Sequence, residues 1–454
     1  MTATRLAAFK AYDIRGKVPM ELNEEVAYKF GRAYGAELNP QGPVAVGHDV
    51  RLSSVPLANA LIKGLNDAGV GTVDIGQCGT EMVYFAAARP GMGGGIMVTA
   101  SHNPMEYNGM KPVKAGAIPI SGDSGLDALE RRVRENDLGP KTATPGTNRN
   151  EDVTAAYVQK LLSFVDLKKF KPLTLVANAG NGCAGPFLDA VAKHLPCHFV
   201  RVHHTPDGTF PNGVPNPMHE ESHPPTAVAV RESGAAFGIA WDGDFDRCFF
   251  FDETGAFVEG YYIVGLLAES MLGKAPGAAV IHDPRLIWNT VERIRAAGGR
   301  PVQSKTGHAF IKERMRKEDA IYGGEMSAHH YFREFAYCDT GMVPWLLLAE
   351  MVSVTGKTLS ELVGDRARAF PCSGEINSRV PDAAAVIAKI RAIYEPQATA
   401  KDETDGISLE FNGVWRFNLR SSQTEPILRL NVEARGDAAL MKAKTAELLA
   451  LIRG

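Results

Sequence analysis

The sequence predicts an α/β protein with three similar mixed α/β domains and a C-terminal α+β domain. Its 454 residues exceed the ~250–300 at which a single hydrophobic core stops growing, so several domains are expected. Apolar runs alternate with amphipathic helical segments from the first domain through the third, which is typical of parallel sheets covered by helices. After about Phe370 strands follow each other directly, which indicates an antiparallel α+β domain.

The first domain is predicted over residues 1–147, and it ends in a polar segment that contains proline and glycine, residues 138–150. Its helices are expected at residues 24–38 and 55–68, and its strands at 43–47, 71–76 and 94–99. The second domain, residues 148–256, restarts the alternation, with helices at 153–164, 185–195 and 226–233 and strands at 173–178, 197–202 and 236–241.

The third domain, residues 257–368, repeats the order of strand and helix. Its helices are expected at 261–272, 286–297 and 308–316, and its strands at 278–283, 301–304 and 320–323. The fourth domain, residues 369–454, is predicted as helix 383–394, two strands at 407–419 and 426–434, and helix 437–452.

Composition restricts the class of protein. Hydrophobic residues make up 45% and charged residues 22%, and no stretch has the ~18 apolar residues that a membrane span needs, so a cytoplasmic protein is expected. The six cysteines are scattered without a C-x-x-C pair, which favours reduced thiols over disulfides or zinc. A net charge of −3 gives no general attraction to nucleic acid or anionic membranes, so an anionic ligand needs a local basic site.

A candidate nucleophile follows the strand at residues 94–99, in the segment Thr99-Ala100-Ser101-His102-Asn103-Pro104. Open α/β sheets bind ligands at the carboxyl ends of their strands, and a nearby histidine or lysine could remove the proton of Ser101. The same residues are also what an ordinary turn is made of, and the segment alone leaves both interpretations open.

A candidate metal site follows the strand at residues 236–241, in Asp242-Gly243-Asp244-Phe245-Asp246-Arg247. Three alternate carboxylates can converge on one hard cation such as Mg²⁺. The spacing resembles a calcium EF-hand loop, but Arg247 stands where that loop needs glycine and the flanks are strands. A solvated acidic turn is the other alternative, although apolar strands on both sides favour a bound cation.

Two further segments could bind a phosphorylated sugar. Glu325 and Ser327, in Gly324-Glu325-Met326-Ser327, can face one ligand and offer an acceptor and a donor to hydroxyl groups. Arg420, before a run of hydroxyl residues, could form a small anion site, although a polar hairpin loop explains that segment equally well. Asp49 and Arg51 are interpreted as a salt-bridged surface scaffold, and a surface pair of this kind contributes little to stability.

Taken together, these motifs resemble the α-D-phosphohexomutase superfamily over essentially the whole chain, most closely its bacterial phosphomannomutase and dual phosphomannomutase/phosphoglucomutase branch. The order T-A-S-H-N-P, D-G-D-x-D-R, G-E-M-S and R-x-S-x-T-E-P carries the resemblance, with the turn Gly79-Thr80-Glu81 and the segment Pro211–Pro217. The resemblance implies four domains around a central cleft and a monomer. It also implies Mg²⁺ as cofactor and a hexose 1,6-bisphosphate as activator and intermediate.

The resemblance also assigns residue roles. Ser101 becomes the phosphoserine, and the metal ligands are Asp242, Asp244, Asp246 and an oxygen on Ser101. Lys111 matches the candidate general acid or base, with Arg15, His102 and His308 as helpers. The substrate-binding residues that it implies are Tyr12, Arg247, Arg285, Gly307, His308, Glu325, Ser327, His329, Arg420, Ser422, Gln423 and Thr424. Gln423 and Arg285 replace the Asn and Lys of other members and keep the hydrogen-bonding or charge type.

The implied function is interconversion of hexose 6-phosphate and hexose 1-phosphate, for mannose and also glucose. Three alternatives remain at this point. One is a mutase restricted to glucose phosphates, and another is a metal-dependent sugar phosphatase with Asp242 as nucleophile. The third is a sugar-phosphate binding protein without catalysis, in which Ser101 would stay unmodified and would tolerate replacement by alanine.

Overall fold

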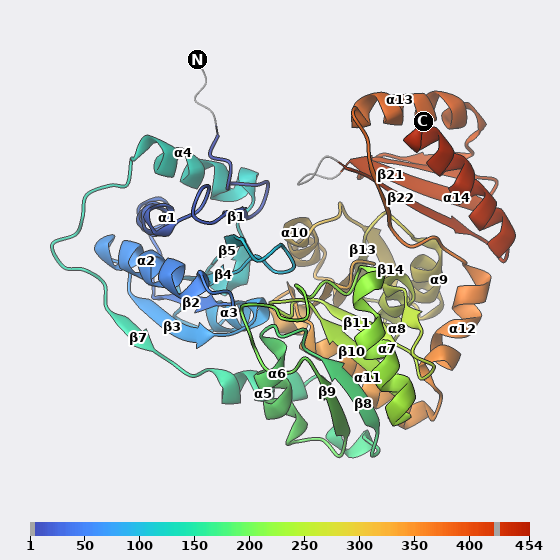
Figure 1. The fold of residues 1–454 in the computed structure, drawn as a ribbon, viewed down its shortest axis with the longest axis horizontal. Helices are drawn as coiled ribbons and strands as arrows, with labels where there is room; N and C mark the ends of the chain where they lie inside the picture. The colour runs from blue at the N-terminus through green and yellow to red at the C-terminus, as the bar shows by residue number, and fades with distance from the viewer. Residues whose placement is uncertain (1–4, 422–426) are drawn as a thin grey trace. The chain divides into compact units, whose positions relative to one another are not determined.

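The computed structural model describes residues 5–421 and 427–454, and it divides into two compact units (Figure 1). The first unit consists of residues 1–257 and 329–356, and the second of residues 258–328 and 357–454. Each unit is built from sheets covered by helices, and each is described separately below.

The first unit begins with a mixed sheet in the order β1-β5-β4-β2-β3-β7, with β6 paired to β5. Its central strands β4, β2 and β3 are parallel, and β5 is antiparallel to β4 and β1. The strands are β1 (Ile14–Lys17), β2 (Val44–His48), β3 (Thr72–Gln77), β4 (Gly94–Val98), β5 (Tyr107–Lys114), β6 (Ile118–Pro119) and β7 (Asn148–Asn150).

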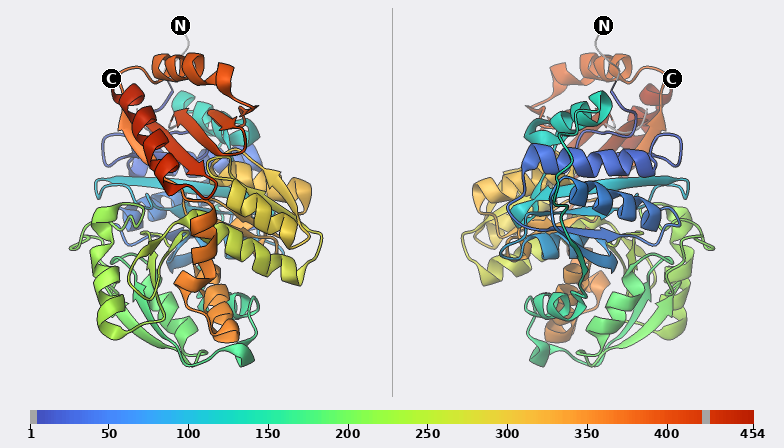
Figure 2. Two further views of the ribbon diagram at one scale, coloured as in Figure 1. Left: turned by 90° about the vertical axis from the view of Figure 1, so that its right-hand side faces the viewer. Right: turned by 90° about the vertical axis from the view of Figure 1, so that its left-hand side faces the viewer.

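The helices of this sheet are α1 (Glu24–Leu38), α2 (Ser54–Asp67), α3 (Thr80–Ala87) and α4 (Asp127–Glu135). Helices α1, α2 and α4 pack together over the sheet (Figures 1 and 2). Their apolar faces bury Phe30, Leu61 and Leu129 against Val46 and Ile96 of the strands. This packing fixes the carboxyl ends of β2 and β4, from which the Ser101 segment is built.

A second sheet of the same unit contains β11-β10-β8-β9, in which β10, β8 and β9 are parallel and β11 is antiparallel to β10. Its elements are α5 (Thr154–Leu162), β8 (Thr174–Asn178), α6 (Ala184–Ala192), β9 (His198–Val202), α7 (Pro224–Ser233), β10 (Phe237–Trp241) and β11 (Cys248–Phe251). Strand β12 (Phe257–Val258) lies at the boundary of the unit. The antiparallel pair β10 and β11 places the acidic segment at its connection.

A later part of the chain returns to the first unit as β16 (His330–Phe332), β17 (Cys338–Asp339) and α11 (Met342–Thr355). Helix α11 packs against α5 and β11. The sequence analysis predicted no helix here, because nearly every residue of Met342–Ala349 is apolar and buried and the segment therefore lacks amphipathic periodicity.

The second unit contains three parallel strands in the order β14-β13-β15. Its elements in this part are α8 (Gly260–Lys274), β13 (Ala279–His282), α9 (Trp288–Ala296), β14 (Arg300–Gln303), α10 (His308–Glu318), β15 (Tyr322–Gly324) and α12 (Leu359–Ala369). Helix α8 packs on α9, α12 and β15, and α10 packs on β13. The predicted helix 286–297 begins two residues late, at Trp288.

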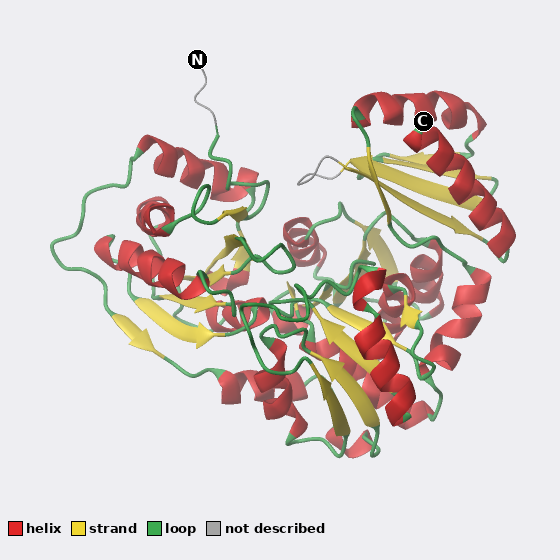
Figure 3. Cartoon of the chain, in the orientation of Figure 1, coloured by secondary structure: helices red, strands yellow, loops and turns green. Residues whose placement is uncertain are grey.

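The C-terminal part of the second unit is an antiparallel sheet in the order β18-β22-β21-β20-β19 with two helices (Figure 3). Its elements are β18 (Ile376–Arg379), α13 (Ala383–Tyr394), β19 (Ala400–Asp402), β20 (Ile407–Phe411), β21 (Trp415–Ser421), β22 (Ile427–Ala434) and α14 (Ala438–Arg453). Helices α13 and α14 pack against each other and against β21 and β22.

The single strand predicted at residues 407–419 was wrong, because this segment forms the hairpin of β20 and β21. Asn412 and Gly413 make the turn with φ of 50° and 67°. Both values lie in the left-handed region that Asn-Gly pairs favour in tight hairpins. The Asn-Gly pair in the sequence was therefore the signal that the strand prediction missed.

The predicted fold class is confirmed: parallel strands with covering helices recur along the chain, and an antiparallel α+β domain ends it. All six cysteines are free, as expected. Among the described residues, none of the helices combines the length and the apolar character that crossing a membrane demands.

Candidate active site

The Ser101 segment follows β4 in the first unit. Ser101 is buried, with 4% of its surface exposed, and its φ of 48° is in the left-handed region. Its hydroxyl donates a hydrogen bond to Oδ2 of Asp242 at 2.6 Å and lies 2.9 Å from Nδ1 of His102. A positive φ is unusual for serine and is held only where surrounding contacts determine it, which is typical of functional turns.

The acidic segment connects β10 and β11, where Trp241 pairs with Cys248. Phe245, between two of the carboxylates, also has a left-handed φ of 45°. A Cβ atom at Gly243 would lie 2.6 Å from the carbonyl oxygen of Ser101, so only glycine permits this approach. The Ser101 loop and the acidic loop are thus packed directly on each other.

Asp242, Asp244 and Asp246 are buried, and one oxygen from each lies within 4.8 Å of the others. Burial raises the pKa of Asp242, and Arg247 offsets part of this while Asp246 and Asp244 add to it. Among the described residues, Oδ1 of Asp244 and Oδ1 of Asp246 accept no hydrogen bond. Buried oxygens without donors and three converging carboxylates fit a hard divalent cation such as Mg²⁺.

Lys111, in β5, reaches the same carboxylates. Its Nζ lies 2.8 Å from Oδ2 of Asp244 and 2.6 Å from Oδ2 of Asp246. Burial would lower the pKa of Lys111, but Asp244 and Asp246 raise it above its ordinary value. Lys111 is therefore held as an ammonium ion, able to stabilise negative charge.

Four further predicted residues belong to this part of the site. Arg15 donates to the carbonyl oxygen of Ala100 at 3.1 Å and to the side chain of Asn103 at 2.5 Å, and Tyr12 is half-buried near it. Arg247 donates to Oδ2 of Asp242 at 2.8 Å and contacts Nδ1 of His102. Burial, together with Arg247 and Arg15, holds the pKa of His102 well below its usual value. His102 is thus neutral beside the Ser101 hydroxyl.

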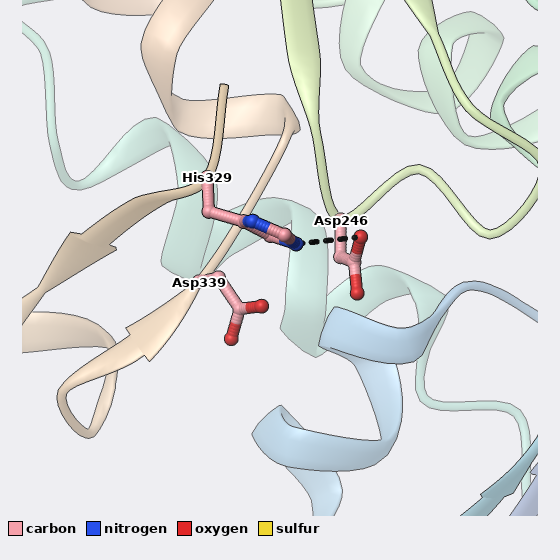
Figure 4. Close-up of side chains that lie close together, drawn as sticks. All are labelled: Asp246, His329 and Asp339. Carbon is pink, nitrogen blue, oxygen red and sulfur yellow. Dashed lines mark ion pairs between the residues drawn. The ribbon is translucent and has the colours of Figure 1, made fainter. Parts of the chain in front are cut away.

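His329 lies beside Asp246 of the acidic loop (Figure 4). Its Nε2 is 3.6 Å from Oδ1 of Asp246, and Arg247 and His329 form a backbone bridge. Burial would raise the pKa of Asp246, but Lys111 and His329 hold it well below its usual value. Asp339 lies close to His329 and Asp246, as Figure 4 shows. Asp246 is therefore ionised, and its negative charge favours binding of a cation.

The second unit brings another group of predicted residues together. Arg285 donates to Oγ of Ser327 at 3.1 Å and lies 3.7 Å from Oε1 of Glu325. The backbone N–H of Gly307 donates to Glu325 at 2.9 Å, and His308 follows as the first residue of α10. These side chains offer the mixture of donors and acceptors that sugar hydroxyls need.

Arg420 lies near the end of β21 and pairs with Glu375 at 3.0 Å. Glu375 also pairs with Arg285 at 3.1 Å and Arg429 at 3.4 Å. Burial would raise the pKa of Glu375, but the three guanidinium groups hold it at about 2. The other residues predicted here, Ser422, Gln423 and Thr424, lie outside the residues that the structure describes.

Sequence reasoning assigned no role to three residues that support these groups. Thr80 donates to Oδ2 of Asp244 at 2.5 Å, and its backbone N–H donates to the Asp244 carbonyl at 3.1 Å. Glu81 connects the same turn to α5 and to Thr340, just before α11, and Glu375 pairs with the arginine cluster. The turn containing Thr80 and Glu81 was noticed only as part of a family pattern, and a single glutamate such as Glu375 gave no signal.

Glu81 is fully buried and makes a testable contribution to stability. It accepts hydrogen bonds from Tyr157, from Oγ1 of Thr340 at 2.7 Å and from the N–H of Gly341 at 2.5 Å. Burial raises its pKa from 4.5 to about 8, although these donors lower it in part. Between these values the folded protein keeps a proton that the unfolded chain loses.

We therefore expect the free energy of unfolding to fall from about pH 4.5 to about pH 8, by at most about 1.4 kcal/mol per pH unit. Glu81→Gln removes this titration, so the stability of the wild-type protein relative to the variant should fall over the same window. Urea unfolding of both proteins across this range measures the difference. Parallel stability curves for the two proteins would contradict the prediction.

Comparison with known proteins places this geometry in a family. Four models of phosphoglucomutase/phosphomannomutase domains match the chain: α/β/α domain I at residues 6–139, domain II at 155–255, domain III at 259–370, and the C-terminal domain at 375–450. The four matches follow each other in order and cover most of the chain.

Similar whole proteins agree with the domain matches. The chain is 60% identical to the phosphohexose mutases of Xanthomonas campestris pv. campestris (strain B100), over 99% of this chain and 100% of the relative. It is 59% identical to the phosphomannomutase of Salmonella typhimurium (strain LT2), over 99% of each. A crystal structure of a phosphoglucomutase/phosphomannomutase family protein from Burkholderia thailandensis superposes with a TM-score of 0.87 at 34% identity, covering 98% of this chain and 97% of that one. The chain therefore belongs to the phosphoglucomutase/phosphomannomutase family of the α-D-phosphohexomutase superfamily.

Proposed function

We propose that this protein is a phosphohexomutase that interconverts hexose 6-phosphate and hexose 1-phosphate through a phosphoserine at Ser101. The observation that carries the proposal is the 2.6 Å contact of the Ser101 hydroxyl with Asp242, in a buried group of three carboxylates. A serine in this place can carry a phosphoryl group beside a cation, and the family membership supplies the class of reaction.

Each phosphoryl transfer breaks one phosphorus–oxygen bond and forms another. Phosphoserine gives its phosphoryl group to the free hydroxyl of a hexose phosphate: the bond from phosphorus to Oγ of Ser101 breaks, a bond to the sugar oxygen forms, and the hydroxyl proton leaves to a base. The product is a hexose 1,6-bisphosphate. Return of its other phosphoryl group to Ser101 completes the cycle and releases the isomeric monophosphate.

Asp242, Asp244 and Asp246 would hold Mg²⁺. When bound, this cation would neutralise the charge of the phosphoryl group during transfer. Lys111 and Arg247 already lie against these carboxylates and would stabilise negative charge at the same place. His102, neutral and 2.9 Å from the Ser101 hydroxyl, is placed to exchange a proton with that oxygen.

The second unit would bind the sugar and the phosphate that is not being transferred. Glu325 and Ser327 would contact sugar hydroxyls beside Arg285, and Arg420 would bind the phosphate. Both groups are built from side chains with fixed partners, so they can select a ligand without large rearrangement.

Substrate choice is tested by a direct comparison. We propose that mannose and glucose phosphates are both used, since the two sugars differ only at the C2 hydroxyl. A coupled assay with mannose 1-phosphate and glucose 1-phosphate, each primed with a trace of the 1,6-bisphosphate, should show turnover of both. Turnover of glucose 1-phosphate alone would favour the mutase restricted to glucose, and release of inorganic phosphate from either would favour the phosphatase.

Arg420→Ala tests the phosphate contact. Loss of a charge-assisted hydrogen bond to phosphate costs ~1.5–3 kcal/mol, so KM should rise by about 10- to 150-fold while kcat changes much less. Steady-state kinetics with glucose 1-phosphate measure both constants. Arg429→Ala is the matched control, because Arg429 pairs with the same Glu375 from the neighbouring strand. Equal KM values for the two variants would remove Arg420 from the phosphate site.

A further inference from the structure

A buried polar network lies beneath the Ser101 loop, and two of its members, Asp49 and Arg51, were interpreted from the sequence as a surface scaffold. Arg51 and Asp49 are instead only 2% exposed each, so the surface assignment was wrong. We propose that Arg51, Asp49 and Thr99 are positioning residues that hold the Ser101 loop in its left-handed conformation for phosphoryl transfer. This inference rests on the proposed function of Ser101.

Arg51 is the central donor of the network. Its Nη2 donates to the carbonyl oxygens of Ser101 at 3.0 Å and Asn103 at 2.6 Å. Its Nη1 donates to those of Pro104 at 2.8 Å and Tyr107 at 3.1 Å. One rigid guanidinium group therefore fixes four backbone carbonyls of the loop that carries the nucleophile, a task for which its planar fork of donors is suited.

Asp49 anchors this guanidinium from below. Its Oδ1 accepts from the backbone N–H of Arg51 at 3.0 Å and from the hydroxyl of Ser54 at 2.5 Å. Its Oδ2 lies 3.3 Å from Nε of Arg51. Because Asp49 directly follows β2 and Ser54 begins α2, the network connects the loop to the rigid body of the sheet and its helix.

Thr99 completes the connection from the strand side. Its hydroxyl donates to Oδ2 of Asp49 at 2.8 Å and accepts the backbone N–H of Ser101 at 2.9 Å. The N–H and the carbonyl of Ser101 are therefore both held by the network, by Thr99 and Arg51 respectively. These bonds hold both backbone polar groups of Ser101 and therefore oppose relaxation of its positive φ.

Among the described residues, none of these three side chains makes a hydrogen bond to the acidic loop, so they should act on the chemistry mainly through the position of Ser101. Arg51 also interacts with Asp244 through its charge, which Arg51→Lys keeps. A displacement of about 1 Å of a reacting group can lower a rate about 100-fold. Substrate binding by the second unit should be unaffected.

Thr99 permits the cleanest test. Thr99→Ser keeps the hydroxyl, whereas Thr99→Val keeps the shape and loses both hydrogen bonds. We expect Thr99→Val to lower kcat by about 10- to 100-fold with KM for glucose 1-phosphate nearly unchanged, and Thr99→Ser to retain most of the wild-type kcat. Equal kcat values for the two folded variants would overturn the proposal.

Arg51→Lys is the second variant, because a single ammonium group cannot bond all four carbonyls. Its matched control is Arg32→Lys: Arg32 is also buried in the first domain and donates to backbone carbonyls, including that of Gly139 at 2.7 Å. Only Arg51→Lys should lower kcat, and it should also shift the ³¹P resonance of the phosphoserine. A merely stabilising arginine would lower the melting temperature in both variants and leave that resonance in place, which would overturn the proposal.

Failure of this inference can be distinguished from failure of the proposed function. Phosphate on Ser101 in the wild-type protein, together with normal turnover by Thr99→Val and Arg51→Lys, would contradict the positioning role alone. Wild-type protein that turns over glucose 1-phosphate without ever carrying phosphate on Ser101 would overturn both.

Discussion

Ser101→Ala should abolish mutase turnover, with a loss of at least about 1,000-fold. The reason is that the variant lacks the side-chain oxygen proposed to carry the phosphoryl group. Binding of glucose 1-phosphate should survive, since the proposed contacts to the sugar and its phosphate come from other residues. Coupled kinetics and isothermal titration calorimetry measure the two effects separately.

The matched control is Ser163→Ala, which removes an exposed hydroxyl that donates to the carbonyl oxygen of Lys160. It should keep wild-type turnover. If Ser101→Ala turned over near the wild-type rate, the phosphoserine mechanism would be wrong. If the variant instead hydrolysed sugar phosphates, the phosphatase with an aspartate nucleophile would replace it.

Asp244→Asn should weaken both magnesium dependence and transfer. The amide keeps the shape of the side chain but removes one of three charges that converge within 4.8 Å, and it leaves Lys111 paired with Asp246. Stabilisation of the transferring group by a metal is worth several kcal/mol, so we expect kcat to fall at least about 100-fold and the Mg²⁺ concentration for half-maximal activity to rise.

Asp252→Asn serves as its control. Asp252 also adjoins β11, but its carboxylate accepts from the backbone and hydroxyl of Thr254 in a local turn. Titration of activity with Mg²⁺ should give the same curve for this variant as for the wild-type protein. An unchanged curve for Asp244→Asn as well would exclude the three carboxylates as the metal site.

The parts of the fold that follow simple periodicity could be predicted from the sequence. The strand expected at residues 236–241 is β10, Phe237–Trp241, because five buried residues end abruptly at a run of carboxylates. Helix α1 begins within the predicted range, since Asn23 caps it and accepts from Val26. Such segments carry their own start and stop signals.

Other elements depend on contacts far away in the sequence. Strand β5, Tyr107–Lys114, contains a glycine, a proline and two lysines, and it is a strand because β4 and β1 pair with it on both sides. Lys111 lies within it because Asp244 and Asp246 compensate its buried charge. No local pattern could predict that compensation.

The residues of the candidate site also differ in whether a local sequence pattern marks them. Local motifs at strand ends, where ligand sites in α/β sheets usually lie, singled out Ser101 and the three aspartates as candidates. Their proposed roles came from the combination of four motifs that carries the family resemblance. Arg51 was judged a surface residue, because its four acceptors are backbone carbonyls and no side-chain motif marks them. A network whose acceptors are backbone carbonyls has no sequence motif, because nearly every residue type could supply such a carbonyl. It could be recognised only from the structure.

Ser101 is proposed to carry the phosphoryl group, and mapping the position of that group distinguishes Ser101 from any other carrier. Wild-type protein is incubated with glucose 1,6-bisphosphate and Mg²⁺, desalted, digested and analysed by peptide mass spectrometry. We expect one phosphate on the peptide that contains Ser101 and none on the same peptide of Ser101→Ala. A phosphate that maps elsewhere, or turnover without any phosphorylated peptide, would contradict it.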